Sequence, residues 1–127
     1  MPNDIHGGEG DDYIYGNGGA DDLYGDEGDD YINGSAGDDE IWGGSGNDIL
    51  FGGTNNTGTI FTDVLHGGSG NDMLYGGTSK TGNFTDGGNQ SVADSKYLYG
   101  DEGHDHIFLS DRVRHSYAKG GSGDDYI

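Results

Sequence analysis

The stretch GGSGNDILFGG, from Gly43 to Gly53, recurs as GGSGNDMLYGG from Gly67 to Gly77, and the two agree at nine of eleven positions. Nonapeptides of the same kind fill most of the chain. In eight copies, position 4 is Gly, position 6 is Asp and position 8 is Ile or Leu. Because a fixed period is the signature of a repeat architecture, the nine-residue unit decides the fold. The eight copies begin at Gly7, Gly16, Gly25, Gly34, Gly43, Gly67, Gly100 and Gly120.

Each nonapeptide predicts a turn of six residues followed by a strand of three. Glycines in the turn permit positive φ and close approach of neighbouring backbones. Side chains alternate along the strand, so position 8 faces inward and positions 7 and 9 face outward. A strand this short cannot stand alone, and its apolar residue is buried only when successive repeats stack. The pattern therefore predicts an all-β solenoid.

The composition of the 127-residue chain excludes an ordinary globular core. Only 29% of the residues are hydrophobic, 29 residues are Gly, and the formal net charge is −19. Such a chain buries too little apolar surface to offset backbone ordering, and on composition alone it is typical of disorder. The negative charge excludes nucleic acid as a partner, because that binding depends on cationic contacts to phosphate. It favours cations instead.

The sequence contains no cysteine, no membrane-spanning run and no recognisable signal peptide. There is no Cys, so disulfides and thiolate metal sites are excluded. No apolar run has the length of a membrane span, and the opening MPNDIHGG does not resemble a signal peptide. If the protein is exported, we expect its secretion signal to lie elsewhere on a longer polypeptide.

The nonapeptide pattern GGxGxDxUx, with U a large aliphatic residue, resembles the repeat of the RTX (repeats-in-toxin, hemolysin-type) calcium-binding family. The resemblance covers almost the whole chain, so residues 1–127 are interpreted as one domain. It implies a right-handed parallel β-roll in which two nonapeptides make one turn, with loops alternating between two edges. It also implies that each calcium ion lies between one loop and the loop one turn later.

Three longer segments interrupt the repeat, at residues 55–62, 79–94 and 109–119. If half-turns are numbered from Gly7, these segments fall in the sixth, eighth and tenth. With two repeats per turn, all three insertions lie on one edge of the roll, here called the second edge. The other edge, the first edge, is uninterrupted. Its half-turns carry Asp at every position 6, namely Asp12, Asp30, Asp48, Asp72, Asp105 and Asp125.

Six aspartates stacked at the spacing of adjacent strands repel one another by about 1 kcal/mol or more per neighbouring pair. A cation between each pair converts that repulsion into coordination. Ca²⁺ suits such a site, because it accepts about six to eight carboxylate and carbonyl oxygens in tolerant geometry. Mg²⁺ demands a more compact octahedral site, and Zn²⁺ prefers nitrogen and sulfur. We therefore expect about five calcium ions on the first edge. The alternative, that Asp merely caps turns, does not explain Asp at position 6 of every copy.

The family resemblance implies further calcium ligands from the backbone carbonyls of the loops. The candidates on the first edge are Gly7, Glu9, Gly10, Gly25, Glu27, Gly28, Gly43, Ser45, Gly46, Gly67, Ser69, Gly70, Gly100, Glu102 and Gly103. On the second edge, Asp21 and Asp39 are expected to share an ion, and Asp63 to close another through an altered loop. We expect one to three ions there. The pattern then fails, since position 6 is Lys96 in the eighth half-turn, where its ammonium is expected to replace an ion, and Ser116 in the tenth.

The outward positions 7 and 9 carry aromatic residues in rows along both faces. Stacked neighbours of this kind stabilise a sheet by about 0.2–1 kcal/mol per pair. The rows are also consistent with an interaction face for sugar rings, another domain or a second copy of the chain. His104 and His106 flank Asp105, but no nucleophile, base and orienting group accompany them. No enzyme is therefore predicted.

Taken with the resemblance, these features predict a fragment of a larger secreted or cell-surface protein of bacterial type, whose remaining polypeptide is its partner. The fragment is expected to fold on calcium binding outside the cell. It would thereby assist type I secretion and rigidify or position a parent exoprotein or adhesin. The alternative is an extracellular filament, matrix or adhesion module that self-associates through its aromatic face or open ends.

Overall fold

The structure, a computed structural model, describes residues 1–53, 62–76, 95–109 and 115–127. These residues form eleven strands in two sheets and contain no helix. The six-stranded sheet comprises, in spatial order, β1 (Asp4–Glu9), β3 (Asp22–Glu27), β5 (Glu40–Ser45), β7 (Thr62–Ser69), β9 (Ser95–Glu102) and β11 (His115–Ser122). The five-stranded sheet comprises β2 (Tyr13–Tyr15), β4 (Tyr31–Asn33), β6 (Ile49–Phe51), β8 (Met73–Tyr75) and β10 (His106–Phe108).

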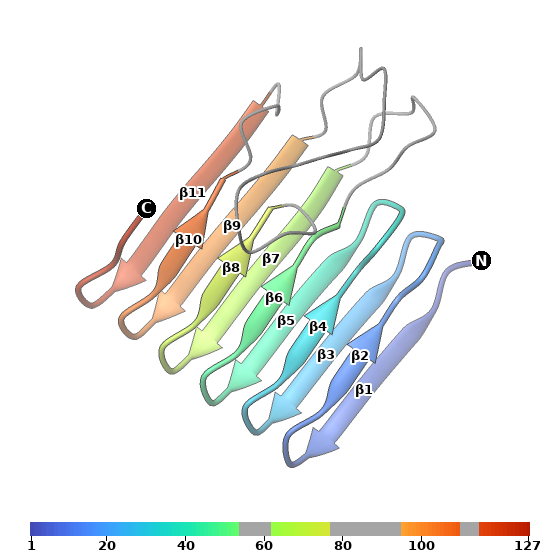
Figure 1. The fold of residues 1–127 in the computed structure, drawn as a ribbon, viewed down its shortest axis with the longest axis horizontal. Helices are drawn as coiled ribbons and strands as arrows, with labels where there is room; N and C mark the ends of the chain where they lie inside the picture. The colour runs from blue at the N-terminus through green and yellow to red at the C-terminus, as the bar shows by residue number, and fades with distance from the viewer. Residues whose placement is uncertain (54–61, 77–94, 110–114) are drawn as a thin grey trace.

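Successive strands alternate between the two sheets, so the chain winds as a flattened coil with two strands per turn (Figure 1). All pairings between these strands are parallel and join strands one turn apart. The register keeps repeat positions aligned. Ile14 pairs with Ile32, and Ile41 pairs with Leu65 across the first long segment. The predicted all-β parallel β-roll, with two nonapeptides per turn, is confirmed.

The strands differ in length between the two sheets. Those of the five-stranded sheet have the predicted three residues, whereas those of the six-stranded sheet have six or eight. The longer strands continue through positions 1 to 3 of the next loop on the first edge, where Asp26 pairs with Gly44 and Glu27 with Ser45. First-edge loops have the same length in every turn, so their backbones hydrogen-bond in register. The predicted three-residue strand was therefore wrong for this sheet.

The core is a single layer of position-8 side chains between the two sheets. These residues are at most 6% exposed, as the alternation predicted. Full burial of one such side chain is worth about 1.5–3 kcal/mol, so each turn contributes only two large apolar groups. The roll is thus short of apolar burial for its length. The core consists of Ile14, Leu23, Ile32, Ile41, Leu50, Leu65, Leu74, Leu98 and Ile107.

Aromatic rings at position 9 stack along the outer face of the six-stranded sheet. Neighbouring ring centroids are 4.4 to 6.0 Å apart and their planes differ by at most 9°. Rings stacked in this way turn their faces to one another and their edges to solvent. The arrangement favours the sheet-stabilising interpretation over sugar docking, which uses ring faces. The stack consists of His6, Tyr24, Trp42, His66 and Tyr99.

Position 9 on the five-stranded sheet departs from the predicted exposure. Phe51 is 1% exposed and Tyr75 is 7% exposed. The two rings stack at 4.7 Å, and each is covered on its other face, Phe51 by Tyr31 at 5.3 Å and Tyr75 by Phe108 at 4.9 Å. An outward side chain is therefore buried where large rings occupy consecutive turns.

Position 4 requires glycine for two backbone reasons. Gly28 has φ +135°, a region that L side chains disfavour. A Cβ at Gly28 would also overlap the carbonyl oxygen of Gly10, one turn earlier. Gly46 repeats both features against Gly28. Glycine at position 4 thus lets loops stack at the spacing of the strands.

The three long segments connect strands of the five-stranded sheet to strands of the six-stranded sheet: β6 to β7, β8 to β9 and β10 to β11 (Figure 1). Their attachment points therefore lie on one edge of the roll, as predicted for the second edge. Residues 54–61, 77–94 and 110–114 themselves lie outside the described residues.

Candidate metal centre

After Asp12, each position-6 carboxylate on the first edge accepts a hydrogen bond from the backbone of the preceding turn. The Asp12 N–H donates to Asp30 Oδ1 at 2.8 Å, and the Asp30 N–H donates to Asp48 Oδ1 at 2.8 Å. The structure thus brings the six predicted aspartates together in one row, one per turn. The later bonds run from Asp48 to Asp72 (2.8 Å), from Asp72 to Asp105 (2.9 Å) and from Asp105 to Asp125 (3.1 Å).

The other oxygen, Oδ2, is buried in seven position-6 aspartates and has no hydrogen-bond partner within the described part of the chain. A buried polar atom without a partner costs about 1–3 kcal/mol, and more when it is charged. Such atoms are rare in native proteins, so a regular row of them indicates a ligand that the polypeptide does not supply. Five lie on the first edge and two on the second. The seven residues are Asp12, Asp21, Asp30, Asp39, Asp48, Asp72 and Asp105.

Backbone carbonyl oxygens converge on the same places. A methyl group added at Gly7 would lie 2.6 Å from Asp12 Oδ2 and 2.7 Å from the carbonyl oxygen of Gly25, one turn later. The same pair of oxygens bounds this space at each first-edge turn up to Gly100. A carboxylate and a carbonyl oxygen facing one small space are the hard donors that Ca²⁺ prefers. Position 1 therefore requires glycine because any side chain would fill the space.

The predicted carbonyl ligands differ in whether their oxygens already accept a backbone hydrogen bond. Position-3 carbonyls accept a hydrogen bond from the preceding loop: the Gly10 N–H donates to the Glu27 oxygen at 2.7 Å, and the Gly28 N–H donates to the Ser45 oxygen at 2.9 Å. A carbonyl oxygen has two lone pairs, so these groups retain one for a metal ion. Position-1 carbonyls, such as that of Gly43, lie beside the unpartnered carboxylate oxygens. Coordination by either set remains a prediction.

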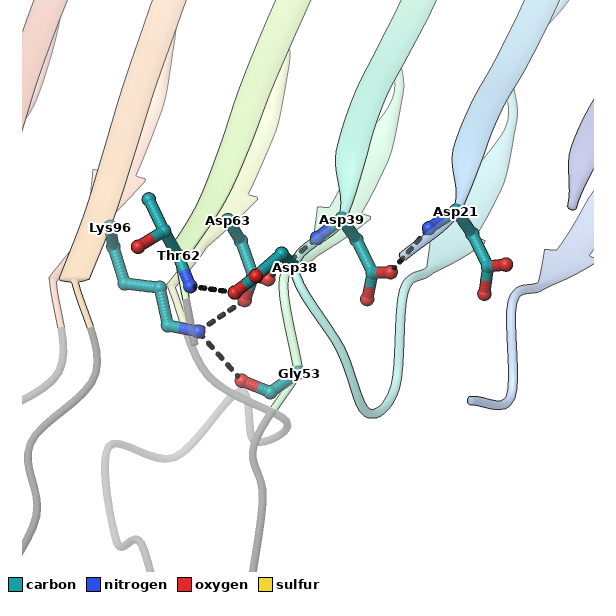
Figure 2. A network of polar contacts seen from close by, with 7 residues as sticks. All are labelled: Asp21, Asp38, Asp39, Gly53, Thr62, Asp63 and Lys96. Atoms are coloured by element: carbon teal, nitrogen blue, oxygen red, sulfur yellow. Dashed lines mark hydrogen bonds and ion pairs between the residues drawn. The ribbon is translucent and has the colours of Figure 1, made fainter. Parts of the chain in front are cut away.

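The second edge repeats the row over a shorter distance (Figure 2). The Asn3 N–H donates to Asp21 Oδ1 at 2.7 Å, the Asp21 N–H to Asp39 Oδ1 at 3.0 Å, and the Asp39 N–H to Asp63 Oδ1 at 3.1 Å. Asp63 therefore stands in the position-6 row despite the altered loop before it. Its Oδ2 differs from the other seven, because it contacts the ammonium of Lys96.

Burial changes the protonation of the row. The pKa of Asp39 and Asp48 is raised from 3.8 to about 6 and that of Asp72 to about 7, mainly by burial and in smaller part by the neighbouring aspartates of the row. Burial also raises the pKa of Asp63, and the Lys96 ammonium opposes that shift. The charged form is thus disfavoured in the protein alone. A divalent cation beside each oxygen would restore it.

A second ladder, at position 5 of the first edge, was missed by the sequence analysis. The Asp29 N–H donates to Asp11 Oδ1 at 2.9 Å, and the Asn47 N–H donates to Asp29 Oδ1 at 2.8 Å. The ladder continues to His104, whose Nδ1 accepts from the Asp124 N–H at 2.9 Å. The available signal was that every first-edge position 5 carries Asp, Asn or His, each of which has a hydrogen-bond acceptor. These exposed residues brace the loops that hold the buried row.

The two histidines that flank Asp105 follow the repeat pattern, since His104, at position 5, lies in a loop and His106, at position 7, is exposed on β10. Within the described ranges, no three His, Cys, Asp or Glu side chains are grouped so that they could hold a metal by themselves. An ion between the loops would therefore need backbone carbonyls or water molecules as ligands in addition to the carboxylates.

In most carboxylates of these rows, one oxygen accepts a hydrogen bond and the other has no partner in the described structure. Such rows between stacked glycine loops define a class of protein, the β-solenoid whose edges coordinate hard cations. A family model described as RTX calcium-binding nonapeptide repeat (4 copies) matches residues 2–32, 24–56 and 57–79. These matches run together from residue 2 to residue 79, more than half of the chain, and the chain belongs to this family. Searches of curated proteins and of solved structures gave no significant match. The described residues include no helix long and apolar enough to cross a membrane.

Proposed function

We propose that this calcium-binding β-roll is a folding switch, disordered without calcium and driven into the roll by calcium outside the cell. The observation that carries this proposal is the set of seven buried carboxylate oxygens without a partner in the described structure. A fold that leaves so many charged oxygens unsatisfied is unstable by itself. The same oxygens become ligands once calcium is present.

Charge and composition support the switch. The chain carries a formal net charge of −19, which opposes collapse. Seven divalent ions would reduce that charge to about −5. Because the complete sites exist only in the roll, binding drives folding by mass action. Each ion needs two adjacent loops, so the first site is the costliest and the transition is cooperative.

The proposed setting is extracellular. Extracellular calcium modules bind at about 10⁻⁴–10⁻³ M, far above cytosolic free calcium. The chain would remain unfolded and threadable inside the cell, pass a type I secretion channel, and fold on exit so that it hinders backsliding. In the folded state, the roll would rigidify or position the rest of an exoprotein or adhesin. We propose no enzymatic role for the roll itself.

Circular dichroism of the chain against free calcium, with magnesium in parallel, tests this function. We expect disorder in excess chelator, a cooperative gain of β-structure at millimolar calcium, and little response to magnesium, which resists the irregular oxygen geometry. A chain already rich in β-structure in chelator, or one that folds equally well with magnesium, would refute the switch.

A second candidate function, self-association into a filament or matrix, rests on the sheet edges. Strands β1 and β11 bound the six-stranded sheet, and among the described residues each pairs with one neighbouring strand. Unpaired strand edges are templates for pairing with another chain. Light scattering with and without calcium separates the two functions, since only an assembling module grows in mass when calcium is added.

A further inference from the structure

The eighth half-turn carries Lys96 at the position where other turns carry aspartate. Lys96 lies on β9, and its side chain is 2% exposed. Register places it opposite Asp63 on the preceding turn and Ser116 on the following turn. A lysine this buried is rare unless its charge is paired.

The Lys96 ammonium reaches back toward the sixth half-turn (Figure 2). Nζ contacts Asp63 Oδ2 and donates a hydrogen bond to the Gly53 carbonyl oxygen at 3.2 Å. Two of its acceptors are thus a position-6 carboxylate oxygen and a loop carbonyl oxygen. These are the same kinds of oxygen that are proposed for calcium in the other turns.

Asp63 differs from the other aspartates of the second-edge row in the partner of its Oδ2 atom. Asp21 and Asp39 lie in the same row, and their Oδ2 atoms have no partner within the described residues, whereas Asp63 Oδ2 has one. At Gly76, position 1 of the eighth half-turn, an added methyl would meet the Lys96 side chain, with Cγ at 3.3 Å. In the other turns that space is bounded by an aspartate. The lysine side chain therefore lies beside Gly76 where other turns place a position-6 carboxylate, so the eighth half-turn offers no carboxylate ligand there.

We infer that the Lys96 ammonium is a built-in substitute for one calcium ion, located between the sixth and eighth half-turns. The second-edge row would then hold two metal ions and end at Asp63. The inference rests on the proposed calcium binding for the remaining positions. It adds that one turn-to-turn junction is held without metal.

A covalently attached cation has a consequence for folding order. Its charge is present at any calcium concentration, so the pairing of strands β7 and β9 does not depend on an ion at this junction. These strands share seven registered residue pairs, more than the five that join β5 to β7. The junction also follows the segment from 77 to 94, whose closure costs entropy. A permanent cation there would start the roll at its middle, and calcium would extend it in both directions.

Two substitutions at Lys96, with an exposed lysine as control, test the inference. Lys96→Met keeps the length of the side chain and removes the charge. It leaves the buried Asp63 carboxylate without its cation, and because that loss is shared among seven cooperative ions, the calcium midpoint should rise about two- to threefold. We expect that rise with no gain of bound calcium. Lys119→Met, on exposed Lys119 of β11, should change neither quantity.

Lys96→Asp restores the repeat pattern and should bind one more calcium ion than the wild type in calorimetric titration. The double variant Asp63→Asn/Lys96→Met removes both partners and should recover most of the midpoint lost in Lys96→Met, because neither charge is then left unpaired. If Lys96→Met and Lys119→Met have the same midpoint, or if Lys96→Asp folds without gaining an ion, the inference is overturned. Failure of the wild type to bind calcium would instead overturn the proposed function.

Discussion

Replacement of Asp48 by Asn tests whether the first-edge aspartates are ligands shared between neighbouring ions. Asp48 Oδ1 accepts the Asp30 N–H at 2.8 Å, whereas Oδ2 has no partner in the described structure and lies beside the Gly67 carbonyl. An amide keeps the Oδ1 acceptor and removes the charge. We therefore expect loss of the ion between the loops of Asp48 and Asp72, and weaker binding in the interval before it.

The magnitude follows from mass action. At about 10 mM calcium and a dissociation constant of about 1 mM, each ion stabilises the fold by RT ln(1 + [Ca²⁺]/Kd), or about 1.4 kcal/mol. Asp48→Asn should then lower the free energy of unfolding by about 1.4–2.8 kcal/mol. Asp125→Asn should lower it by at most about 1.4 kcal/mol, because within this chain Asp125 faces only the interval it shares with Asp105.

Urea unfolding at fixed calcium, combined with calorimetric ion counts, measures both effects. The matched control is Asp29→Asn, at the exposed position 5 that is already Asn in two later turns. It should lose no ion. Equal ion losses from Asp48→Asn and Asp125→Asn would refute the shared-ligand account, and an ion lost from Asp29→Asn would show that the outer ladder also coordinates.

Three further predictions concern pH, the loops and the aromatic rows. Burial raises the pKa of three row carboxylates above the unfolded value of 3.8, so acidification should stabilise the metal-free roll. The three carboxylates are those of Asp39, Asp48 and Asp72. That stabilisation is complete below about pH 4 and lost as pH rises through about 7, and circular dichroism in chelator should show it. In calcium, acidification should instead lower the stability of the loaded roll toward that of the metal-free roll, because protons displace the ions. Gly28→Ala should prevent folding at any calcium concentration, because the added Cβ overlaps the Gly10 carbonyl oxygen. Gly8 also has a positive φ, but an added Cβ there has nothing within 4 Å. Gly8→Ala should therefore lower the free energy of unfolding in urea by only about 1–2 kcal/mol. Phe51→Ala should lower the free energy of unfolding by about 3–5 kcal/mol, and Tyr13→Ala by about 0.5 kcal/mol or less, because the Phe51 ring is 1% exposed and the Tyr13 ring 78%. Similar losses from the two variants would contradict a stacked, buried row.

The sequence predicts those features that the nine-residue period fixes directly. Position 8 gives the core because strand alternation leaves it no other direction, as Leu50 and Leu74 show. The row of position-6 aspartates follows from counting two repeats per turn. The same count places the insertions on one edge and assigns Asp63 to the row.

Features that depend on backbone hydrogen-bond partners were not predictable from residue types. The six-residue strands arise because equal first-edge loops pair in register, which a pattern of side chains does not reveal. Burial of Phe51 depends on rings in both neighbouring turns. Lys96 was expected to stand in for an ion, but its acceptors, Asp63 Oδ2 and the Gly53 carbonyl, depend on how the chain re-enters the roll after a long insertion.

A crystal structure of the calcium-loaded chain, with calcium located by its anomalous scattering, tests the central claim most directly. The account predicts five ions along the first edge and two along the second, each beside a position-6 Oδ2 that lacks a partner in the described structure. Equal numbers of ions on the two edges, or ions bound away from these oxygens, would contradict it.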